Sequence, residues 1–433
     1  MKYVEYCAGI GGTRAGLDAA GWECVLAVDH DPDAVLVHRM AHGTAVEGDV
    51  TQLSPQDVPH AHVWVAGFPC QPFSSSGSRS GFGHKSGNVF EHLARLIGDR
   101  EPPVVVLENV EGLLTNKAGH TFASILHALT GCGYEVDWLV MNLRWYGVPQ
   151  SRRRLFVVAA KRGVLRVGAL PEAPGLLSGP GETVPSVFWE YLVHKKLSLR
   201  LRSMGKIGGV IERVRPAIGK AQHAGPHLFG GLGHASGVDY WSFELRGPVE
   251  ERAPDGLAAI VAPDFPLPEQ IRSVRYYSRG LGTRAYTRAE AVSHCVGTSL
   301  GGAPLFAVPA ATVEKAETRG AFLRFANWHR EQDGLLVMRL VPERAVLLFG
   351  PHTASLSDAV GAWNGGATRK FKLVGNMVAP VCARDIATIV GEHATEGVLG
   401  GGCRRRAVEA SRRGCSASKA STVSGREGCG PVR

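Results

Sequence analysis

A short apolar strand followed at once by a glycine-rich turn opens the chain: Lys2–Tyr6 reads KYVEY and residues 7–12 read CAGIGG. Glycines in such a turn let the backbone approach a ligand at the carboxyl edge of a parallel sheet. The dinucleotide fingerprint GxGxxG would require glycine at position 14, where this chain has Arg14. The turn therefore favours a nucleoside ligand over a pyrophosphate. A purely structural tight turn is the alternative that this stretch alone leaves open.

Short β-rich runs alternate with helical stretches as far as residue 165, which predicts an α/β fold with helices on the faces of the sheet. From residue 168 to residue 367 proline and glycine become frequent and the expected strands are short, so we predict a second, irregular domain there. Apolar residues return at helical spacing over residues 371–389. Strands are expected at residues 2–6, 23–28, 63–66, 104–107, 134–142 and 154–160, and helices at residues 13–20, 32–40, 88–98 and 121–130.

The composition is that of an ordinary folded protein, with 44% hydrophobic and 20% charged residues among 433. We find neither a long uncharged apolar run nor a signal peptide, so we expect a cytoplasmic protein without a membrane span. Nine cysteines without a CxxC pair disfavour a zinc site, and we expect no metal. Residues 401–433 carry +6 of the net charge of +9, which predicts a disordered, solubilising tail, with phosphate contacts as the alternative.

Carboxylates follow the second expected strand and the third element of the chain. Asp29 and His30 come at the end of the second strand, and Asp49 precedes Val50 after the third element. A carboxylate at the end of the second strand suits ribose hydroxyls, and Asp49 is placed to accept from an adenine amino group. Each aspartate taken singly is also a plausible helix cap. Together with the glycine turn, these loops predict an adenosine pocket without a phosphate clamp, which fits S-adenosylmethionine.

A cysteine between two prolines follows the strand at residues 63–66, within residues 67–74 (GFPCQPFS). This places Cys70 on a stiffened loop at the ligand edge. A free thiol has a pKa of about 8.5, so a nucleophilic role requires surroundings that favour the thiolate. Glu108, in the sequence ENV, follows the strand at residues 104–107, and QSRRR at residues 150–154 brings arginines to the same edge. Strand alternation predicts Arg152 and Arg154 on one face of the strand. Taken alone, Glu108 could also be a helix cap, and the arginines could also be solvated surface charges.

In this order the motifs resemble those of the C5-cytosine-specific DNA methyltransferase family of bacterial restriction-modification systems. Later segments continue the resemblance: GTRAY at residues 282–286, RLVPE at residues 339–343 and GNMV at residues 375–378. The resemblance implies a Rossmann-like, S-adenosylmethionine-dependent methyltransferase fold, with a mixed sheet and a smaller target-recognition domain. The implied parts are a catalytic and cofactor-binding domain (1–165), a target-recognition domain (166–370, variable core about 170–275), a segment returning to the catalytic domain (371–398) and a basic tail (399–433).

The resemblance also implies a role for each matching residue. Cys70 attacks C6 of a flipped-out cytosine, Glu108 contacts N3 and the exocyclic amine, and Arg154 supports the base and Cys70. Arg152 completes the catalytic set. Three positions depart from the usual family pattern: Cys7 replaces phenylalanine, His30 replaces a residue that is often aromatic, and Met377 replaces serine or alanine. The implied cofactor-binding residues are Cys7, Gly9, Ile10, Gly11, Gly12, Asp29, His30, Asp49, Val50, Pro69, Val89, Asn376, Met377 and Val378.

The activity we expect is that of a DNA (cytosine-5-)-methyltransferase, acting on duplex DNA as a monomer with a cognate endonuclease as its genetic partner. An RNA cytosine-C5 methyltransferase is the alternative within the same chemistry, and the long variable segment disfavours it. Arg14 and the proline-flanked cysteine disfavour a nicotinamide oxidoreductase. The intact catalytic motifs disfavour a non-catalytic DNA-binding relative. Eight lysines and arginines within residues 194–220 predict phosphate contacts, with a solvated basic face as the alternative.

Overall fold

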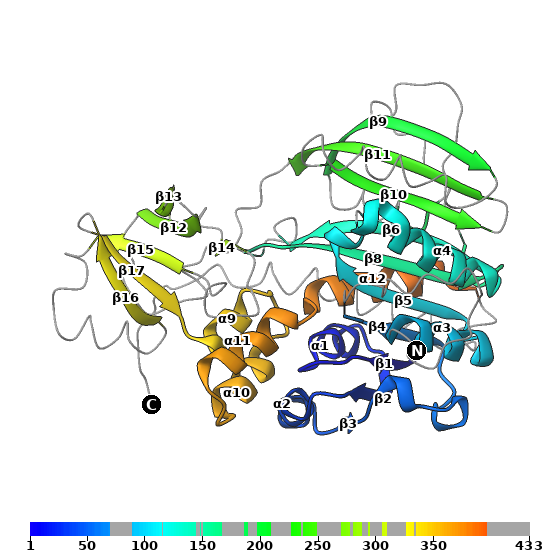
Figure 1. The fold of residues 1–433 in the computed structure, drawn as a ribbon, viewed down its shortest axis with the longest axis horizontal. Helices are drawn as coiled ribbons and strands as arrows, with labels where there is room; N and C mark the ends of the chain where they lie inside the picture. The colour runs from blue at the N-terminus through cyan, green and yellow to red at the C-terminus, as the bar shows by residue number, and fades with distance from the viewer. Residues whose placement is uncertain are drawn as a thin grey trace, which may run out of the picture.

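The computed structural model of the chain describes residues 1–69, 89–114, 116–143, 148, 150–166, 186–188 and 341–395, together with the strands between residues 197 and 340 (Figure 1). Within this part, the strands form sheets of ten, five and two strands. The ten-stranded sheet carries the pocket described below. The five-stranded sheet lies apart from it in Figure 1.

The ten-stranded sheet is mixed, as the sequence predicts. Strands β3, β2, β1, β4 and β5 run parallel in that order, and β8 then pairs antiparallel with both β5 and β6. The order reverses between β1 and β4, and in open α/β sheets ligands bind in the crevice outside the carboxyl ends of the strands at such a point. The strands are β1 (Lys2–Tyr6), β2 (Glu23–Asp29), β3 (Val46–Glu47), β4 (Val63–Ala66), β5 (Val104–Val110), β6 (Tyr134–Asn142) and β8 (Arg153–Lys161).

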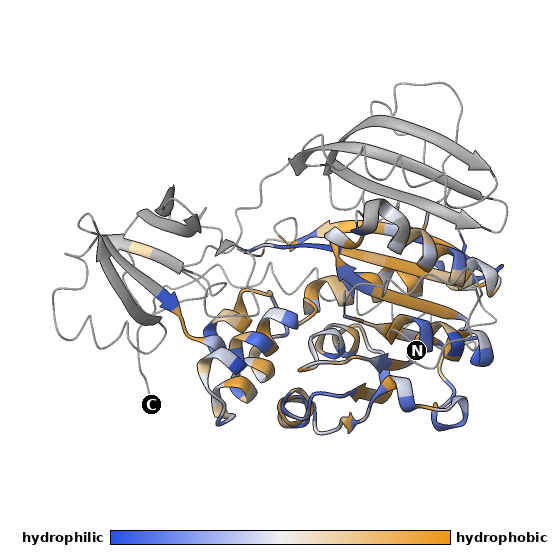
Figure 2. Cartoon of the chain, in the orientation of Figure 1, coloured by the Kyte–Doolittle hydropathy of each residue, from blue (hydrophilic) through white to orange (hydrophobic). Residues whose placement is uncertain are grey.

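Two hydrophobic cores lie on the two faces of this sheet because its strands are apolar on both sides. In β1, Tyr3 belongs to one core and Val4 to the other. Figure 2 shows hydrophobic residues concentrated along the central strands. Helices α1, α2 and α12 contribute to the core that contains Tyr3, and α3 and α4 to the core that contains Val4. These helices are α1 (Gly12–Ala19), α2 (Pro32–His42), α3 (Val89–Arg100), α4 (His120–Gly131) and α12 (Pro380–His393).

The elements predicted for the first 165 residues agree with the structure to within a few residues at each end. The largest difference is in β5, which continues from the predicted end at Leu107 as far as Val110. The additional residues are held by antiparallel pairing with β8, where Glu108 lies opposite Phe156 and Val110 opposite Arg154. The motif ENV is therefore part of a strand, which fixes the direction of its side chains.

The predicted recognition region contributes strands to both large sheets. Strands β10 (His227–His234), β11 (Gly237–Pro248) and β9 (Leu197–Gly208) extend the ten-stranded sheet beyond β6. The five-stranded sheet has the order β13-β12-β15-β17-β16. Its strands are β12 (Gln270–Tyr277), β13 (Gly280–Thr287), β15 (Leu305–Pro309), β16 (Ala326–Gln332) and β17 (Leu335–Leu340), and the remaining short pair is β7 (Gln150–Ser151) with β14 (Ser293–His294).

The helices that follow β17 pack into the hydrophobic core that contains Tyr3. Side chains of α9 (Pro342–Leu347) and α10 (Ala354–Ala362) are buried in the same cluster as those of α1 and α12. The return to the core thus begins before residue 371, where the sequence places it, and the domain limits stay a prediction. Helices α11 (Ala367–Asn376) and α12 form one stretch apolar enough to cross a membrane, with 83% of its apolar window buried inside the fold. Such burial is typical of a core helix.

Candidate active site

The turn between β1 and α1 follows a path that depends on glycine. Gly9 and Gly11 have φ angles of 54° and 91°, in the left-handed region. Cys7 adopts φ 53° without being glycine, which is uncommon for a residue with a Cβ atom. A Cβ atom on Gly12 would overlap the carbonyl of Val378 and the side chain of Met377. The GNMV segment is therefore packed directly against the turn.

Asp29 ties this turn to the next loop of the sheet. Its carboxylate accepts hydrogen bonds from Gly9 N at 2.8 Å and from Asp31 N at 2.9 Å. Asp49 accepts from Thr51 N at 2.8 Å, and this backbone hydrogen bond is the main cause that lowers its pKa. Of these two aspartates, Asp49 makes the helix-capping contact that the sequence left open, at the start of the short helix Val50–Gln52, whereas α2 is capped by Asp31 and not by Asp29. Asp29 and Asp49 also line a cavity of about 690 Å³.

This cavity runs from the glycine turn to the ends of β4, β5 and β8. Its volume lies within the range of small-molecule sites, about 300–1,000 Å³. His30 lies at the rim, with 75% of its side chain exposed. In contrast, Ile10 is completely buried behind the turn. The predicted site residues that line the cavity are Cys7, Gly9, Asp29, His30, Asp49, Val50, Pro69, Val89, Glu108, Arg152, Arg154 and Asn376.

Glu108 is the buried acid of this cavity. Arg154 forms an ion pair with Glu108, with 3.2 Å between Arg154 Nε and Glu108 Oε1, and both side chains are largely buried. Burial raises the pKa of the Glu108 carboxyl, while the charges of Arg154 and Arg152 oppose that shift. Because burial dominates, the neutral acid is favoured more than in water. The arrangement can hold or donate a proton at this position.

Asn109, next to Glu108, holds the loop that leads to the predicted nucleophile. Its Nδ2 donates to the carbonyl of Phe68 at 2.9 Å, and its Oδ1 accepts from Val110 N. A Cβ atom on Gly67 would lie 3.6 Å from Glu108 Oε2, so the loop passes directly beside the acid. Cys70 itself lies outside the described residues.

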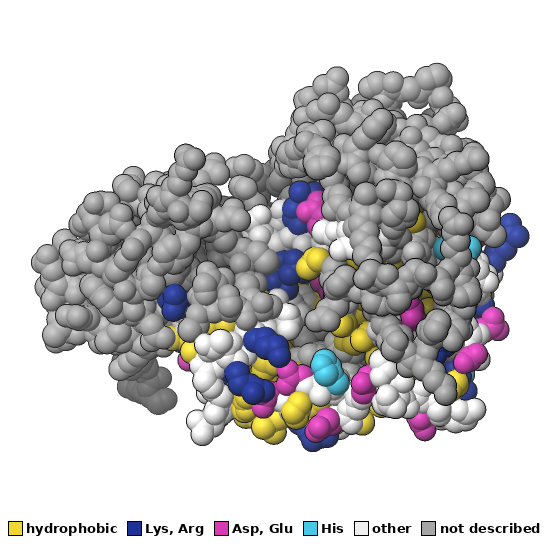
Figure 3. Space-filling view, in the orientation of Figure 1, with side chains coloured by type: hydrophobic (Ala, Val, Ile, Leu, Met, Phe, Trp, Pro, Cys, Tyr) yellow, Lys and Arg dark blue, Asp and Glu magenta, His cyan; other side chains and the backbone are white. Residues whose placement is uncertain are grey.

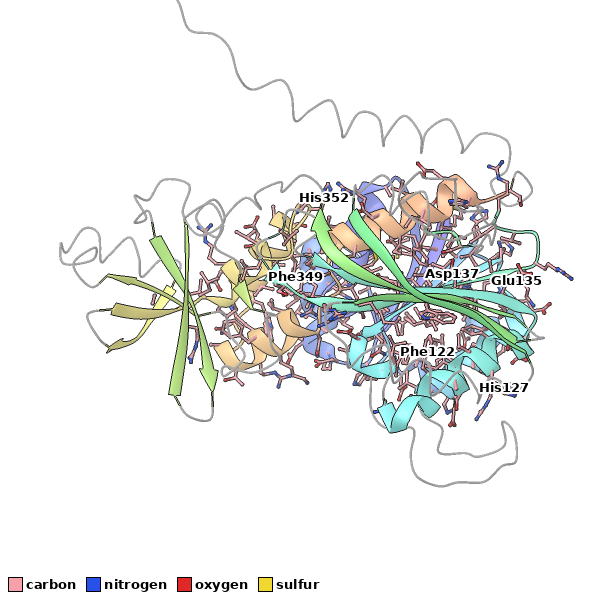
Figure 4. The ribbon with its side chains drawn as sticks, turned by 90° about the horizontal axis from the view of Figure 1, so that it is seen from above. Phe122, His127, Glu135, Asp137, Phe349 and His352 are labelled. Carbon is pink, nitrogen blue, oxygen red and sulfur yellow. The ribbon has the colours of Figure 1, made fainter. Side chains whose placement is uncertain are left out.

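Arg152 contacts the late segment of the chain. Its Nη2 donates to the carbonyls of Gly375 and Met377 at 2.8 and 2.9 Å, and its guanidinium lies 4.9 Å from the ring centre of Phe349 (labelled in Figure 4). Only 2% of Arg152 is exposed. The arginine therefore connects β7–β8 with the GNMV segment, and its predicted catalytic role stays a prediction. Arg153 instead pairs with Glu111 at 2.8 Å.

A family model of the C-5 cytosine-specific DNA methylase matches residues 1–178. This part of the chain belongs to that family. The methylase part is similar to Type II methyltransferase M.BsuFI of Bacillus subtilis, with 39% identity over 158 residues, which is 36% of this chain and 39% of the relative. M.MspI of Moraxella sp is 33% identical over 46% of this chain and 47% of its own length. M.NgoBV of Neisseria gonorrhoeae is 30% identical over 58% of each chain. These matches thus span about two fifths to three fifths of each relative.

The fold is also that of a solved methyltransferase. The crystal structure of the S. pombe Dnmt2 methyltransferase superposes with a TM-score of 0.50 at 14% identity, covering 90% of this chain and 99% of that chain. At this identity the likeness concerns the fold alone. It agrees with the Rossmann-like methyltransferase fold that the sequence predicts.

Several residues that line the cavity were not singled out in the sequence. Lys372 and Leu373 come from α11, and Asp31 caps α2. Lys372 Nζ lies 3.3 Å from Asp31 Oδ2, and Arg369 pairs with Asp33 beside it. Figure 3 shows basic, acidic and histidine side chains gathered on this face, over α2 and α11. No local sequence pattern predicts these contacts, because α11 and α2 are more than three hundred residues apart in the chain.

Three further predictions fall wholly or partly outside the described residues. These concern the loop after Pro69, the side chains of the basic stretch at residues 194–220, and the tail from residue 399. Among the residues that are described, no group of three histidine, cysteine or acidic side chains is arranged to hold a metal ion.

Proposed function

We propose that the chain is a DNA (cytosine-5-)-methyltransferase that transfers a methyl group from S-adenosylmethionine to C5 of cytosine in duplex DNA. The observation that carries this proposal is the shared cavity. The glycine turn and Asp29 line this cavity, and the buried pair of Glu108 and Arg154 lines the same cavity. The chain enters this space at Pro69, directly before Cys70.

The residues of the cavity fit the proposed cofactor. Gly9 presents backbone without a side chain, the carboxylate of Asp29 suits ribose hydroxyls, and Val50 and Leu373 supply apolar walls. Asn376 adds an amide at the side formed by α11. Bound S-adenosylmethionine would supply an electrophilic sulfonium methyl group. A fully enclosed phosphate clamp is not needed for such a ligand, in agreement with Arg14 in the fingerprint position.

The chain's own residues would activate the base. Cytosine C5 is a weak nucleophile, and addition of the Cys70 thiolate to C6, with Glu108 holding a proton at N3, makes C5 reactive. The raised pKa of Glu108 favours the protonated acid that this contact requires. After C5 has gained the methyl group, loss of the C5 proton to a base breaks the sulfur–C6 bond and releases the Cys70 thiolate. These ring atoms are inaccessible in a stacked duplex, so the cytosine must be flipped out.

Target recognition is proposed for the variable region of residues 170–275, with residues 194–220 contacting phosphates. Several relatives are described as Type II methyltransferases. We propose the same restriction-modification role here, in the cytoplasm and as a monomer. Exchanging residues 170–275 for those of a relative with another specificity should move methylation to the relative's sequence, as read by bisulfite sequencing.

The nucleophile is tested by Cys70→Ser with labelled S-adenosylmethionine and unmethylated plasmid. We expect methyl transfer to fall below about 1% of the wild type, because the hydroxyl has no accessible anion, while cofactor affinity stays within about tenfold. Cys132→Ser, on a cysteine at the C-terminus of α4, is the matched control and should keep full activity. Parallel assays with RNA test whether DNA or RNA is the substrate. Methyl transfer to RNA but not to DNA would overturn the proposed substrate.

A further inference from the structure

Two histidines lie one turn apart on α2 and face the glycine turn. The ring centres of His38 and His42 are 4.9 Å apart. His38 Nδ1 lies 3.3 Å from the carbonyl oxygen of Gly9, and His42 Nε2 lies 3.1 Å from that of Gly11. His38 is fully buried. Two successive turns of one helix thus hold two carbonyls of one loop.

The rings fit the loop closely because Gly11 has no side chain. A Cβ atom on Gly11 would lie 2.5 Å from His42 Nε2 and 3.1 Å from His38 Cε1. On the amide side of the same turn, Gly9 N donates to Asp29. The N–H group of Gly9 is therefore bound by Asp29 at the end of β2, and its C=O group is contacted by His38 of α2. These contacts fix Gly9 and Gly11, two of the three residues of the turn that have left-handed φ angles.

Each ring must donate a hydrogen bond through an N–H group to make its contact, because a carbonyl oxygen can only accept a hydrogen bond. Burial is the main cause that lowers the pKa of His38, to about 3, and that of His42. Arg14 lowers both, while Asp18 and the backbone contact oppose the shift at His42. At neutral pH each neutral ring thus carries one N–H group, and that group faces a loop carbonyl.

We infer that His38 and His42 are positioning residues for the cofactor, which hold the glycine turn in the shape that opens it to the cavity. The inference deepens the proposed function and rests on it for the identity of the ligand. Neither ring lines the cavity, so neither acts by touching the cofactor. The competing explanation is that the rings only fill the space between α2 and the turn.

Paired substitutions separate a hydrogen-bonding role from filling. His42→Gln keeps an N–H group near the position of Nε2, and His42→Leu fills the space without a donor. His38→Asn and His38→Leu form the equivalent pair at Nδ1. By calorimetry, we expect the leucine variants to bind S-adenosylmethionine about fivefold more weakly for each lost hydrogen bond, and the amide variants to stay within about twofold.

A matched control comes from another histidine pair. His62 Nδ1 accepts from Lys2 N, and its ring contacts His60 at the opposite end of β1. His62→Leu should leave cofactor affinity unchanged. Equal losses in the leucine and amide variants of His38 and His42, or none in either, would overturn the inference. If the buried His38→Leu variant fails to fold, the half-buried His42 pair still decides.

Hydrogen exchange of the ligand-free protein separates this inference from the proposed function. The leucine variants should exchange the amides of the 9–13 turn about fivefold faster or more than the wild type, and the amide variants should not. If the wild type failed to bind S-adenosylmethionine, the proposed function would be wrong, and the exchange data would still test the grip on the turn. Unchanged exchange in His42→Leu would refute it.

Discussion

Replacing Arg152 by lysine separates the contact seen in the structure from the role that the family resemblance implies. One nitrogen of Arg152 donates to the carbonyls of Gly375 and Met377, and the planar group lies over Phe349. Lysine keeps the charge but has a compact ammonium group and no plane to stack. We expect Arg152→Lys to retain at most one of the two carbonyl contacts.

The loss can be sized from the contacts. A hydrogen bond from a charged donor contributes about 1.5–3 kcal/mol, and one such bond is lost. Asn376 lies between the two carbonyls and lines the cavity, so a displaced segment changes the cofactor wall. If most of about 2 kcal/mol is felt there, the Kd for S-adenosylmethionine rises about thirtyfold. Once cofactor is saturating, the single-turnover rate should stay within about threefold.

Calorimetry gives the affinity, and rapid-quench single turnovers with labelled cofactor give the rate. Arg153→Lys is the matched control, because Arg153 pairs with Glu111 at a more exposed position. It should leave affinity and rate nearly unchanged. An Arg152→Lys enzyme with normal cofactor affinity and a rate lowered about 100-fold would refute this reasoning and assign Arg152 to the base.

Three other changes probe neighbouring features. Burial raises the pKa of Glu5 to about 8, so the folded protein keeps a proton that the unfolded chain releases above about pH 4.5, and stability should fall by about 1.4 kcal/mol per pH unit between these values. Urea unfolding of Glu5→Gln should lack this fall, so a pH-independent difference from wild type would contradict it. Asn109→Asp removes the donor to Phe68 and should lower single-turnover methyl transfer while leaving cofactor Kd within about threefold. Glu108→Gln should slow the chemical step about 100-fold with little change in DNA affinity, and the reverse pattern would make Glu108 a binding group.

Sequence reasoning predicted which residues come together at one edge of the sheet where the local pattern determines the structure. Each strand end is marked by an apolar run followed by glycine or a carboxylate, and parallel strands bring these ends to one edge. This is why Gly9, Asp29 and Glu108 line one cavity as expected. The end of β5 was misplaced because its last residues are held by pairing with β8 rather than by their own apolar pattern.

The parts that the sequence did not predict depend on contacts between distant segments. Nothing near His38 in the chain indicates that its ring will face Gly9, twenty-nine residues away. The pairing of Lys372 with Asp31 joins residues 341 positions apart. Such contacts follow from how α2 and α11 pack, and packing is decided by the whole core rather than by a motif.

The structure of residues 150–154 depends both on local sequence pattern and on contacts with distant segments. Its alternation was predicted, and the structure brings Arg152 and Arg154 to the same cavity. Yet the two side chains make different contacts there: Arg154 pairs with the acid of β5, and Arg152 holds carbonyls beside Asn376. One strand end thus supports both the proposed base side and the proposed cofactor side. Because Arg152 lies at the junction of β7 and β8 and Arg154 at the start of β8, only two residues separate the contacts that serve the two sides.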